Sequence, residues 1–376
     1  TQPAKLLRDL IALPSVNPAF LPPNDPRAGE KRVADFLVET ARRGGLDVEW
    51  QEVFPKRSNV LVRLRPSAKI RQRVLLAPHM DTVGAASEDQ FTPVLKNGRL
   101  HGRGACDTKG SVAVMLAALL DLARTGRGPT ETEILLVALV DEECGQTGSR
   151  HLAKRGFRAD FAIVGEPTCL RIVTAHKGDL WLQLETQGKA AHGSRPELGR
   201  NAVHLMARIV HLLLTDYADQ LRRRRHPLLR HATINVGAIT GGRQPNIVPD
   251  RCVIQIDRRT LPGEKDPVVK REILRFIRRR GLAATMRDTK NDEPAPPLET
   301  DPRLPLVQQL MRCARQQKPA GGDFFTDAGV LAGGGIPSVV FGPGDIAQAH
   351  TADEWVALRE LDRGLALLRR FLATLA

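Results

Sequence analysis

A short apolar run that ends in three acids constrains the fold of this chain more than any other stretch. Residues Ile134–Gly145 read ILLVALVDEECG. A continuous run of Leu and Val is typical of a strand that is buried on both faces of a sheet. The acids Asp141, Glu142 and Glu143 follow without a turn residue. Three adjacent carboxylates repel one another and resist desolvation, which favours a bound cation, although a solvated strand end also fits one such triplet.

Strands and helices alternate over most of the chain. Strand-like runs occur at Arg73–Ala77, Phe161–Val164 and Ser338–Phe341, and helical segments such as Lys109–Thr125 separate them. This alternation predicts an α/β fold in which helices flank a mixed, largely parallel sheet.

The pattern changes near residue 174. A strand, a long helix (Leu198–Leu214), two strands and a second helix follow, before a Pro-rich segment at residues 293–297. That order is most of a split βαβ sandwich. We therefore expect residues 174–293 to form an inserted ferredoxin-like α+β domain, and residues 1–173 and 294–376 to form the catalytic, metal-binding domain.

Composition narrows the class of protein. A hydrophobic content of 42% and a charged content of 26% over 376 residues are ordinary for a soluble globular protein. The net charge of +14 fits nucleic acid, an acidic surface or anionic substrates as partners. Nucleic-acid binding favours aromatic side chains among the basic ones, and one Tyr and three Trp give little support for it, so Arg222–Arg225 and Arg278–Arg280 favour a solvated face.

Cysteine usage and hydropathy predict a location. The five cysteines form no CxxC pair, which favours reduced thiols, and no apolar run approaches the length of a membrane span. The first residues carry charges through their apolar stretch, unlike a signal peptide. We expect a cytoplasmic protein without a membrane anchor.

Candidate metal ligands follow several of the predicted strands. Four of them come at the carboxyl ends of four different strands, and they are His79, Asp107, Glu143 and Glu166. Ligands of open α/β sheets bind at that edge. A fifth, His350, lies in the loop after the last predicted strand. Imidazoles and carboxylates suit zinc, cobalt or manganese, and five ligands exceed what one tetrahedral zinc needs, so two metal ions with a shared bridge are implied.

Five motifs, in order along the chain, resemble one family of hydrolases. They are PHMDTV (Pro78–Val83), GRGACDTKG (Gly102–Gly110), DEE (Asp141–Glu143), GEPT (Gly165–Thr168) and GPGDIAQAH (Gly342–His350). The chain resembles the family of acetylornithine deacetylase, succinyl-diaminopimelate desuccinylase, aminoacylase and carboxypeptidase G, which are co-catalytic zinc metallopeptidases. The resemblance covers essentially the whole chain, and Gly342–Glu354 looks closest to the acetylornithine deacetylases, enzymes of arginine biosynthesis.

The resemblance implies two Zn²⁺ ions per subunit, for which Co²⁺ or Mn²⁺ can substitute. Asp107 would bridge the two ions. His79 and Glu166 would hold one ion, and Glu143 and His350 would hold the other.

The resemblance also implies the groups that surround the metals. Glu142 would be the general base, and Asp81 would hydrogen-bond the free ring nitrogen of His79, although Asp81 also fits a turn residue. Two zinc ions about 3.5–4 Å apart acidify a bridging water. A carboxylate beside them can take the proton and later pass it to the leaving amine. A cis peptide between Asp107 and Thr108 is implied as well.

Substrate contacts and assembly are implied in the inserted domain. His192, in the motif GKAAHGSRP, would polarise the scissile carbonyl from a neighbouring subunit of a homodimer, although a surface or capping histidine is the alternative. The substrate-binding residues would be Asn246, Arg259, Arg258 and Thr326. The family's spacing selects Arg259 for the substrate carboxylate, with Arg258 as the second choice, because an arginine fork fits a carboxylate. Phe325 stands where the family has Gly before Thr326.

The expected function is hydrolysis of a linear amide bond in a small substrate. We expect a metal-dependent deacetylase that removes an acyl group from an N-acyl-L-amino acid. A desuccinylase, carboxypeptidase or dipeptidase activity at the same site is the alternative. A binding protein without catalysis is the alternative from another class, and the presence of Glu142 argues against it, because mere binding has no use for a base.

Overall fold

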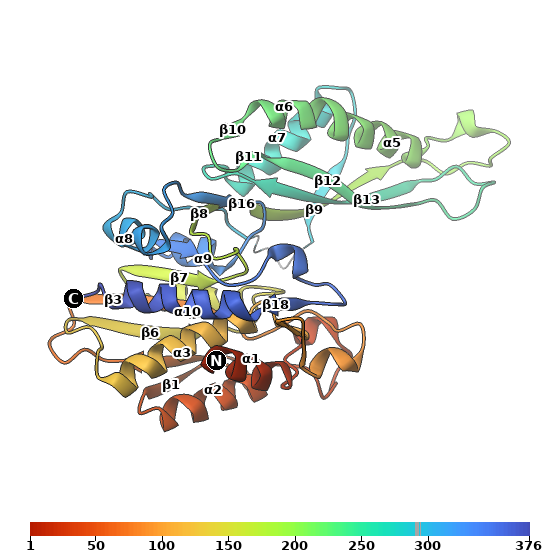
Figure 1. Cartoon of the computed structure of the whole chain (residues 1–376). Coiled ribbons are helices and arrows are strands. Elements are labelled where there is room, and N and C mark those ends of the chain that lie inside the picture. Colours follow the sequence, from red (N-terminus) through yellow and green to blue (C-terminus); the bar gives the residue numbers. More distant parts are fainter. Residues whose placement is uncertain (290–292, 294) are drawn as a thin grey trace. The chain divides into compact units, whose positions relative to one another are not determined.

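Two compact units make up the chain in the computed structural model, which describes residues 1–289, 293 and 295–376 (Figure 1). Unit 1 comprises Thr1–Thr174, Glu299–Gly321 and Thr326–Ala376, and unit 2 comprises Ala175–Leu298 and Gly322–Phe325. The expected domain boundary at residue 294 lies outside the described residues. The lid and dimerisation roles expected of the inserted segment stay predictions.

The larger sheet is mixed and has a parallel centre. Within the described residues it has nine strands in the order β1-β2-β6-β3-β7-β17-β8-β15, with β16 paired to β8. Neighbours among β6, β3, β7 and β17 run parallel, whereas β1, β2 and β8 pair antiparallel. The strands are β1 (Asp47–Phe54), β2 (Arg57–Leu64), β3 (Gln72–Pro78), β6 (Thr132–Ala138), β7 (Phe161–Gly165), β8 (Val173–His176), β15 (Leu298–Glu299), β16 (Ala320–Gly322) and β17 (Ser338–Val340). The predicted α/β class is confirmed.

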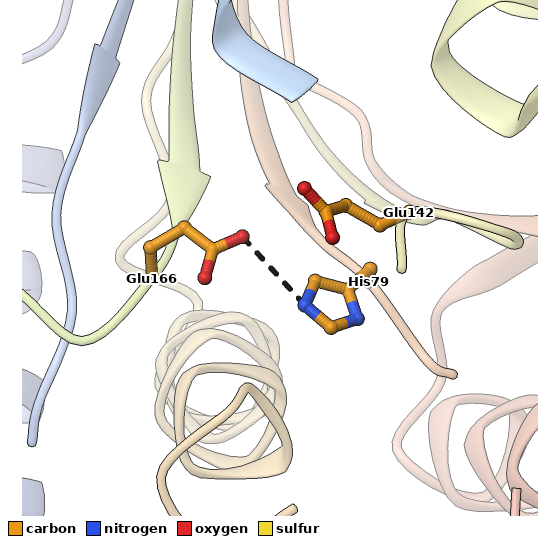
Figure 2. A group of neighbouring side chains, drawn as sticks. All are labelled: His79, Glu142 and Glu166. Atoms are coloured by element: carbon orange, nitrogen blue, oxygen red, sulfur yellow. Dashed lines mark ion pairs between the residues drawn. The ribbon is translucent and has the colours of Figure 1, made fainter. Parts of the chain in front are cut away.

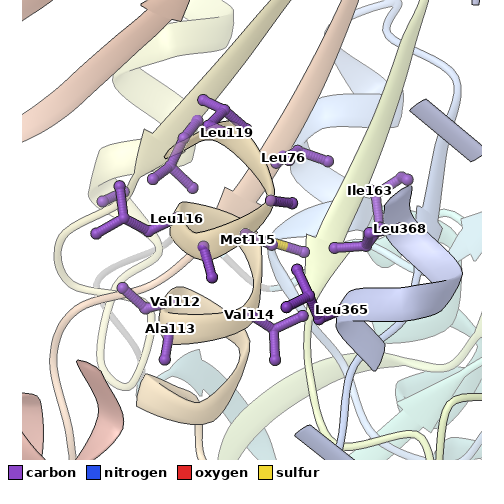
Figure 3. Close-up of a cluster of buried hydrophobic side chains, with 14 of the residues drawn as sticks. Leu76, Val112, Ala113, Val114, Met115, Leu116, Leu119, Ile163, Leu365 and Leu368 are labelled. Carbon is purple, nitrogen blue, oxygen red and sulfur yellow. The ribbon is translucent and has the colours of Figure 1, made fainter. Parts of the chain in front are cut away.

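Helix α3 (Lys109–Thr125) lies at the centre of the core of unit 1. It contacts β3 and β6, and it also contacts α1 and α10 (Figure 1). Every residue from Lys109 to Leu119 is buried, because small residues alternate with Val, Met and Leu around the helix. Figure 3 shows the apolar side chains of this helix between Val112 and Leu119 in the core. The helices of unit 1 are α1 (Gln2–Ile11), α2 (Lys31–Arg43), α3, α4 (Thr147–Lys154), α8 (Pro305–Ala314), α9 (Asp327–Gly333) and α10 (Leu358–Leu372).

Unit 1 also contains a small sheet and several short helical turns. A small sheet has the order β18-β5-β4. Its strands are β4 (Val94–Lys96), β5 (Arg99–His101) and β18 (Trp355–Ala357), and the 3₁₀ turns of unit 1 are η1 (Pro18–Phe20), η2 (Glu88–Phe91) and η5 (Ile346–Gln348).

Unit 2 is a four-stranded antiparallel sheet with helices. The sheet order is β12-β13-β9-β14, and the chain order is β-α-β-β-α-β, which confirms the expected ferredoxin-like sandwich. The main elements are β9 (Gly178–Gln187), η3 (Pro196–Leu198), α5 (Ala202–Leu212), η4 (Leu213–Tyr217), α6 (Ala218–Arg223), β12 (Thr233–Gly241), β13 (Arg251–Thr260), α7 (Asp266–Arg278) and β14 (Thr285–Asp288), with a two-stranded ribbon of β10 (Arg225–His226) and β11 (Arg230–His231).

The long helix predicted at Leu198–Leu214 has different ends. It begins after Asn201, whose side chain caps α5 by accepting the His204 N–H, because Pro196–Leu198 forms a separate 3₁₀ turn. At its other end it continues through the π-helical turn η4 into α6. Among the described residues, no helix combines the length and the apolar character that crossing a membrane requires.

Candidate metal centre

Parallel strands bring the first candidate ligands together. His79 follows β3 directly, and Glu166 follows β7 directly. Since β3 and β7 are neighbours in the sheet, with Pro78 opposite Gly165, the two side chains meet at the carboxyl edge (Figure 2). His79 Nε2 lies 3.6 Å from Glu166 Oε1.

The acids that follow the central strand lie beyond its end. Strand β6 stops at Ala138, earlier than the apolar run suggested, and Leu139 still forms a bridge to His79. The side chain of Glu142 lies beside His79 and Glu166 (Figure 2).

Asp107 reaches the site by a different route from the one expected. It does not end a strand of the large sheet. It lies in the Gly-rich turn between β5 and α3, next to Thr108, which is the N-cap of α3. The peptide bond between Asp107 and Thr108 is cis, as the resemblance implied.

The carboxylate of Asp107 faces two histidines, one with each oxygen. Its Oδ1 lies 3.1 Å from Nε2 of His79, and its Oδ2 lies 3.2 Å from Nε2 of His350. His350 also lies 3.2 Å from Oε2 of Glu143. The structure thus brings all five candidate ligands into one cluster, with Asp107 in the middle.

The cluster fits divalent metal ions. Ligand atoms of His79, Glu142 and Glu166 lie within 4.8 Å of one another, and so do those of His79, Asp107 and Glu143. Oε1 of Glu143 is buried and has no hydrogen-bond partner in the described structure. A buried carboxylate oxygen without a partner costs free energy that a cation would recover. Nitrogen and oxygen ligands of this kind suit zinc, cobalt or manganese.

The electrostatics of the cluster also favour a cation. Burial raises the pKa of Glu143 to about 7, and the charge of Asp107 acts in the same direction. Burial likewise raises the pKa values of Glu142 and Glu166 well above their ordinary range. Hydrogen bonds to Asp107 and Glu143 raise the pKa of His350 to about 10. Buried carboxylates whose charged form is penalised by desolvation are stabilised by a bound cation.

Asp81 is fully buried and organises the site through the backbone. Its Oδ1 accepts the N–H of Glu142 and its Oδ2 accepts the N–H of Glu143. Nδ1 of His79 lies 3.0 Å from the main-chain oxygen of Asp81 and 3.5 Å from its carboxylate. Asp81 thus lies against His79, but the hydrogen bond of Nδ1 is to the main-chain oxygen, and the carboxylate is farther away. The contacts to the two backbone N–H groups were not foreseen from the sequence.

Asp141 turns away from the other two acids of the triplet. Its φ of 67° is left-handed, a conformation that is uncommon for a residue other than Gly. Its carboxylate meets Asn17 at 2.9 Å, Thr147 at 2.5 Å and Arg57 at 3.4 Å. The cationic partner that the triplet was expected to need is therefore, for Asp141, an arginine.

Glu354 was missed by the sequence reasoning, although it holds the loop that carries Asp107. One oxygen accepts the N–H groups of Cys106 and Asp107, and the other accepts Gly104 N–H and an Nη1–H of Arg103. Glu354 is almost completely buried. Its separation of 247 to 251 residues from these partners leaves no local sequence signal.

Two further buried groups were missed. Lys109 donates from Nζ to the carbonyl oxygens of Leu10 and Leu13 and so ties the end of α1 to the start of α3. Asp327 lies close enough to His79 to sense its charge, and burial raises the pKa of Asp327 to about 7. Its place next to Thr326, one of the expected substrate-binding residues, was the available signal for Asp327.

The other residues expected to bind substrate divide between the two units. Thr326 belongs to unit 1, where its hydroxyl caps α9 by accepting the Ala328 N–H. His192 and Asn246 belong to unit 2, and both are exposed. The backbone holds their loops together, since Gly193 donates its N–H to the Asn246 carbonyl.

The adjacent arginines of β13 point to opposite faces, as strand geometry requires. Arg258 is completely buried and pairs with Glu264 at 2.7 Å. Arg259 is only partly buried, and its guanidinium is paired with Asp257 at 2.8 Å. It also lies over the ring of Phe325, the residue that replaces a family Gly, 5.4 Å from the ring centroid. Of the two arginines, Arg259 is the one that solvent reaches.

Comparisons with known proteins match this picture. An acetylornithine deacetylase of Myxococcus xanthus is 32% identical over 356 residues, which is 90% of this chain and 90% of the relative. An acetylornithine deacetylase of Proteus mirabilis is also 32% identical, over 94% of this chain and 91% of its own. A metallo-carboxypeptidase of the M20 family from Sulfolobus solfataricus shares the fold, with a TM-score of 0.78 at 19% identity and coverage of 99% of each chain.

The family model described as peptidase family M20/M25/M40 matches residues 75–374, which contain all five candidate metal ligands and Glu142. The match covers well over half of the chain. The chain therefore belongs to peptidase family M20/M25/M40 and is a hydrolase of amide bonds.

Proposed function

We propose that this protein is a two-metal amidohydrolase that removes the acyl group from an N-acyl-L-amino acid, with N-acetylornithine as the substrate best supported. The proposal of two metal ions rests on the Asp107 carboxylate, because one of its oxygens faces His79 and the other faces His350. The relatives named acetylornithine deacetylase, which match along 90% of the chain, support the choice of substrate.

Two metal positions are proposed. His79, Glu166 and Asp107 would hold one divalent ion, and Asp107, Glu143 and His350 would hold the other. The bound ions would lower the pKa of a water molecule and polarise the scissile carbonyl.

Glu142 is the proposed general base and acid. Its carboxylate lies beside His79 and Glu166, and the residue is only about 7% exposed. In this position it can take a proton from the attacking water and return it to the leaving amine. Asp81 positions it, because the Asp81 carboxylate accepts the Glu142 N–H.

Unit 2 would supply the substrate contacts. Arg259 is proposed to bind the α-carboxylate, because it is partly exposed and its guanidinium plane is fixed by Asp257 and Phe325. His192 is proposed to donate a hydrogen bond to the carbonyl oxygen. The Ser194 N–H donates to His192 Nδ1, so the neutral ring carries its proton on Nε2 and is a donor there.

Unit 2 is also proposed to be the lid and the dimerisation domain. Strand β12 is an edge of its sheet and is mostly exposed, with Ile239 at 55%. An exposed strand edge with an apolar side chain favours pairing with another chain, and a second copy would fit it.

Substrate profiling tests the proposal. The protein would be loaded with Zn²⁺ or Co²⁺ and supplied with N-acetyl-L-ornithine, an N-succinyl amino acid and a dipeptide, with free amine as the readout. We expect kcat/KM for the acetylated substrate to exceed the others by at least about tenfold, a difference of about 1.4 kcal/mol in transition-state binding. Chelation should abolish activity and added metal should restore it. Preference for the succinyl or dipeptide substrate would select the alternative, and no hydrolysis by fully loaded protein would point to a binding protein.

A further inference from the structure

A groove on unit 1 gathers cationic side chains away from the metal centre. It has a volume of about 560 Å³ and is lined by residues of the loop 169–171, of the segment 314–318 and of α10. Its cations are Arg171, Arg315, Lys318, Arg363 and Arg370. Leu170 and Leu367, both nearly buried, contribute an apolar part to the lining.

These cations come from three separate segments. Arg363 and Arg370 lie seven residues apart on α10, which places them on the same face of the helix about two turns apart. Arg315 has a left-handed φ of 54° and ends α8. Arg171 follows the loop that begins at Glu166. The positive charge of the groove is thus a product of the tertiary fold and not of one helix face.

In the part of the chain that the structure describes, the cations of the groove are not paired with acids. No carboxylate is among the residues that line it, and within the described residues none of its five cations forms a salt bridge. Two acids close to its rim are Asp345 and Glu360. Asp345 accepts the Ala347 N–H and Glu360 accepts the Gly344 N–H, so both are engaged with backbone.

A second arginine-rich groove, on unit 2, is different. Its volume is about 410 Å³, and the side chain of Glu272 lines it. Arg224 is bound by both oxygens of Glu272 at 2.8 Å, and Arg280 pairs with Asp216 at 2.9 Å. Much of this basic surface therefore serves intramolecular pairing, whereas the cations that line the groove on unit 1 form no salt bridge within the described residues.

We propose that the groove on unit 1 binds a small organic anion with at least two acidic groups, phosphate or carboxylate, and a compact apolar part. Five like charges in a concave site raise the local potential and attract anions. Arginine forks bind phosphate and carboxylate oxygens in pairs. The lining holds no aromatic side chain on which a base could stack, so a small anion is favoured over single-stranded nucleic acid.

A fluorescent polyanion tests the site in the full-length, metal-loaded protein. The trisulfonated dye pyranine has several acidic groups on an apolar ring system and is a weak metal chelator. We expect saturable binding by fluorescence anisotropy that weakens as salt is added. The double variant Arg363→Gln/Arg370→Gln should bind at least about tenfold more weakly, because it removes two charge-assisted contacts from exposed positions.

The matched control is Arg271→Gln/Arg275→Gln on α7, which removes the same charge from exposed helical positions that line the second groove, on unit 2. Its affinity for the dye should stay within about twofold of the parent, since distant surface charges are screened. Equal losses in both double variants, or binding that does not saturate, would overturn the proposal.

Competition then identifies the chemistry of the ligand. Displacement of the dye by a sugar bisphosphate would assign a phosphorylated ligand, and displacement by tricarballylate would assign a carboxylated one. Either result supports the site. Displacement by neither, or a stronger effect of a single-stranded oligonucleotide, would refute a small-anion site.

Discussion

At the scale of single residues, three consecutive acids have three different environments. Asp141 is turned toward Asn17 and Arg57, Glu143 faces His350, and Glu142 lies beside His79. Separate partners remove much of the repulsion expected of adjacent carboxylates. The same separation allows neighbouring residues to have separate functions.

The first prediction distinguishes the two acids of the metal centre. Glu142→Gln should retain both metals and lose several orders of magnitude in kcat, because a general base alone contributes about 10²–10⁴-fold and orientation of the water adds to it. Glu143→Gln should lose metal, because it removes the carboxylate that is proposed to bind one metal ion together with His350, which lies 3.2 Å away. Metal analysis of both purified variants checks this. Full and equal occupancy together with equal activity would contradict the assignment of the two roles.

The second prediction concerns Glu354. Replacement by Ala should destabilise the protein by about 3–5 kcal/mol, because Arg103 is left as an unpaired buried charge and the loop of Asp107 loses its acceptors. Glu354→Gln should be milder, since one oxygen can still accept hydrogen bonds. Metal content after dialysis should fall in both variants, more in Ala than in Gln.

Glu49→Gln is the control for Glu354, because Glu49 is an exposed residue of strand β1 that makes a surface ion pair. Its stability and metal content should match the parent, since exposed pairs contribute about 0–1 kcal/mol. Normal metal retention in Glu354→Ala would show that this carboxylate does not position Asp107.

At the scale of elements, local patterns predicted more than distant contacts did. The apolar strands and the motifs directly after β3 and β7 placed His79 and Glu166 correctly, because the ends of adjacent parallel strands must meet. The same reasoning misplaced Asp107, which reaches the site from a turn before α3. Contacts such as Lys109 with Leu10 depend on packing between segments about a hundred residues apart, and no local pattern encodes them.

Strand β13 gives the third prediction. Arg258→Gln should lower stability by about 3 kcal/mol, because it leaves the partly buried Glu264 with only its longer ion pair to Arg224, at 3.6 Å. Arg259→Gln should lower stability less than Arg258→Gln, because its nearer partner Asp257 is partly exposed and the buried Asp179 lies farther away, at 3.7 Å. It should lower kcat/KM by roughly tenfold or more, as expected for a lost hydrogen bond to a charged group. Thermal denaturation and steady-state kinetics on both variants separate the two effects. If Arg258→Gln lowered kcat/KM and Arg259→Gln lowered only stability, the substrate carboxylate would be bound by Arg258 or by another residue.

At the scale of the whole molecule, the candidate residues are divided between two units. The five candidate metal ligands and Glu142 belong to unit 1, whereas Arg259, Asn246 and His192 belong to unit 2. Each unit has its own hydrophobic core. On the proposed mechanism, unit 2 would have to deliver its side chains to a metal centre, in the same subunit or in a partner.

The last prediction decides whether His192 acts in the active site of its own subunit or in that of a partner subunit. His192→Ala and Glu142→Gln proteins should each be nearly inactive, because one lacks the proposed donor to the carbonyl oxygen and the other lacks the base. If His192 acts in the partner subunit, a mixed dimer contains one site with both Glu142 and His192 intact. Mixing the variants under conditions that exchange subunits should then restore activity, up to about half of the parent's sites in each mixed dimer. Exchange would be followed with differently tagged chains. An inactive mixture despite proven exchange would place His192 in its own subunit's site or outside catalysis.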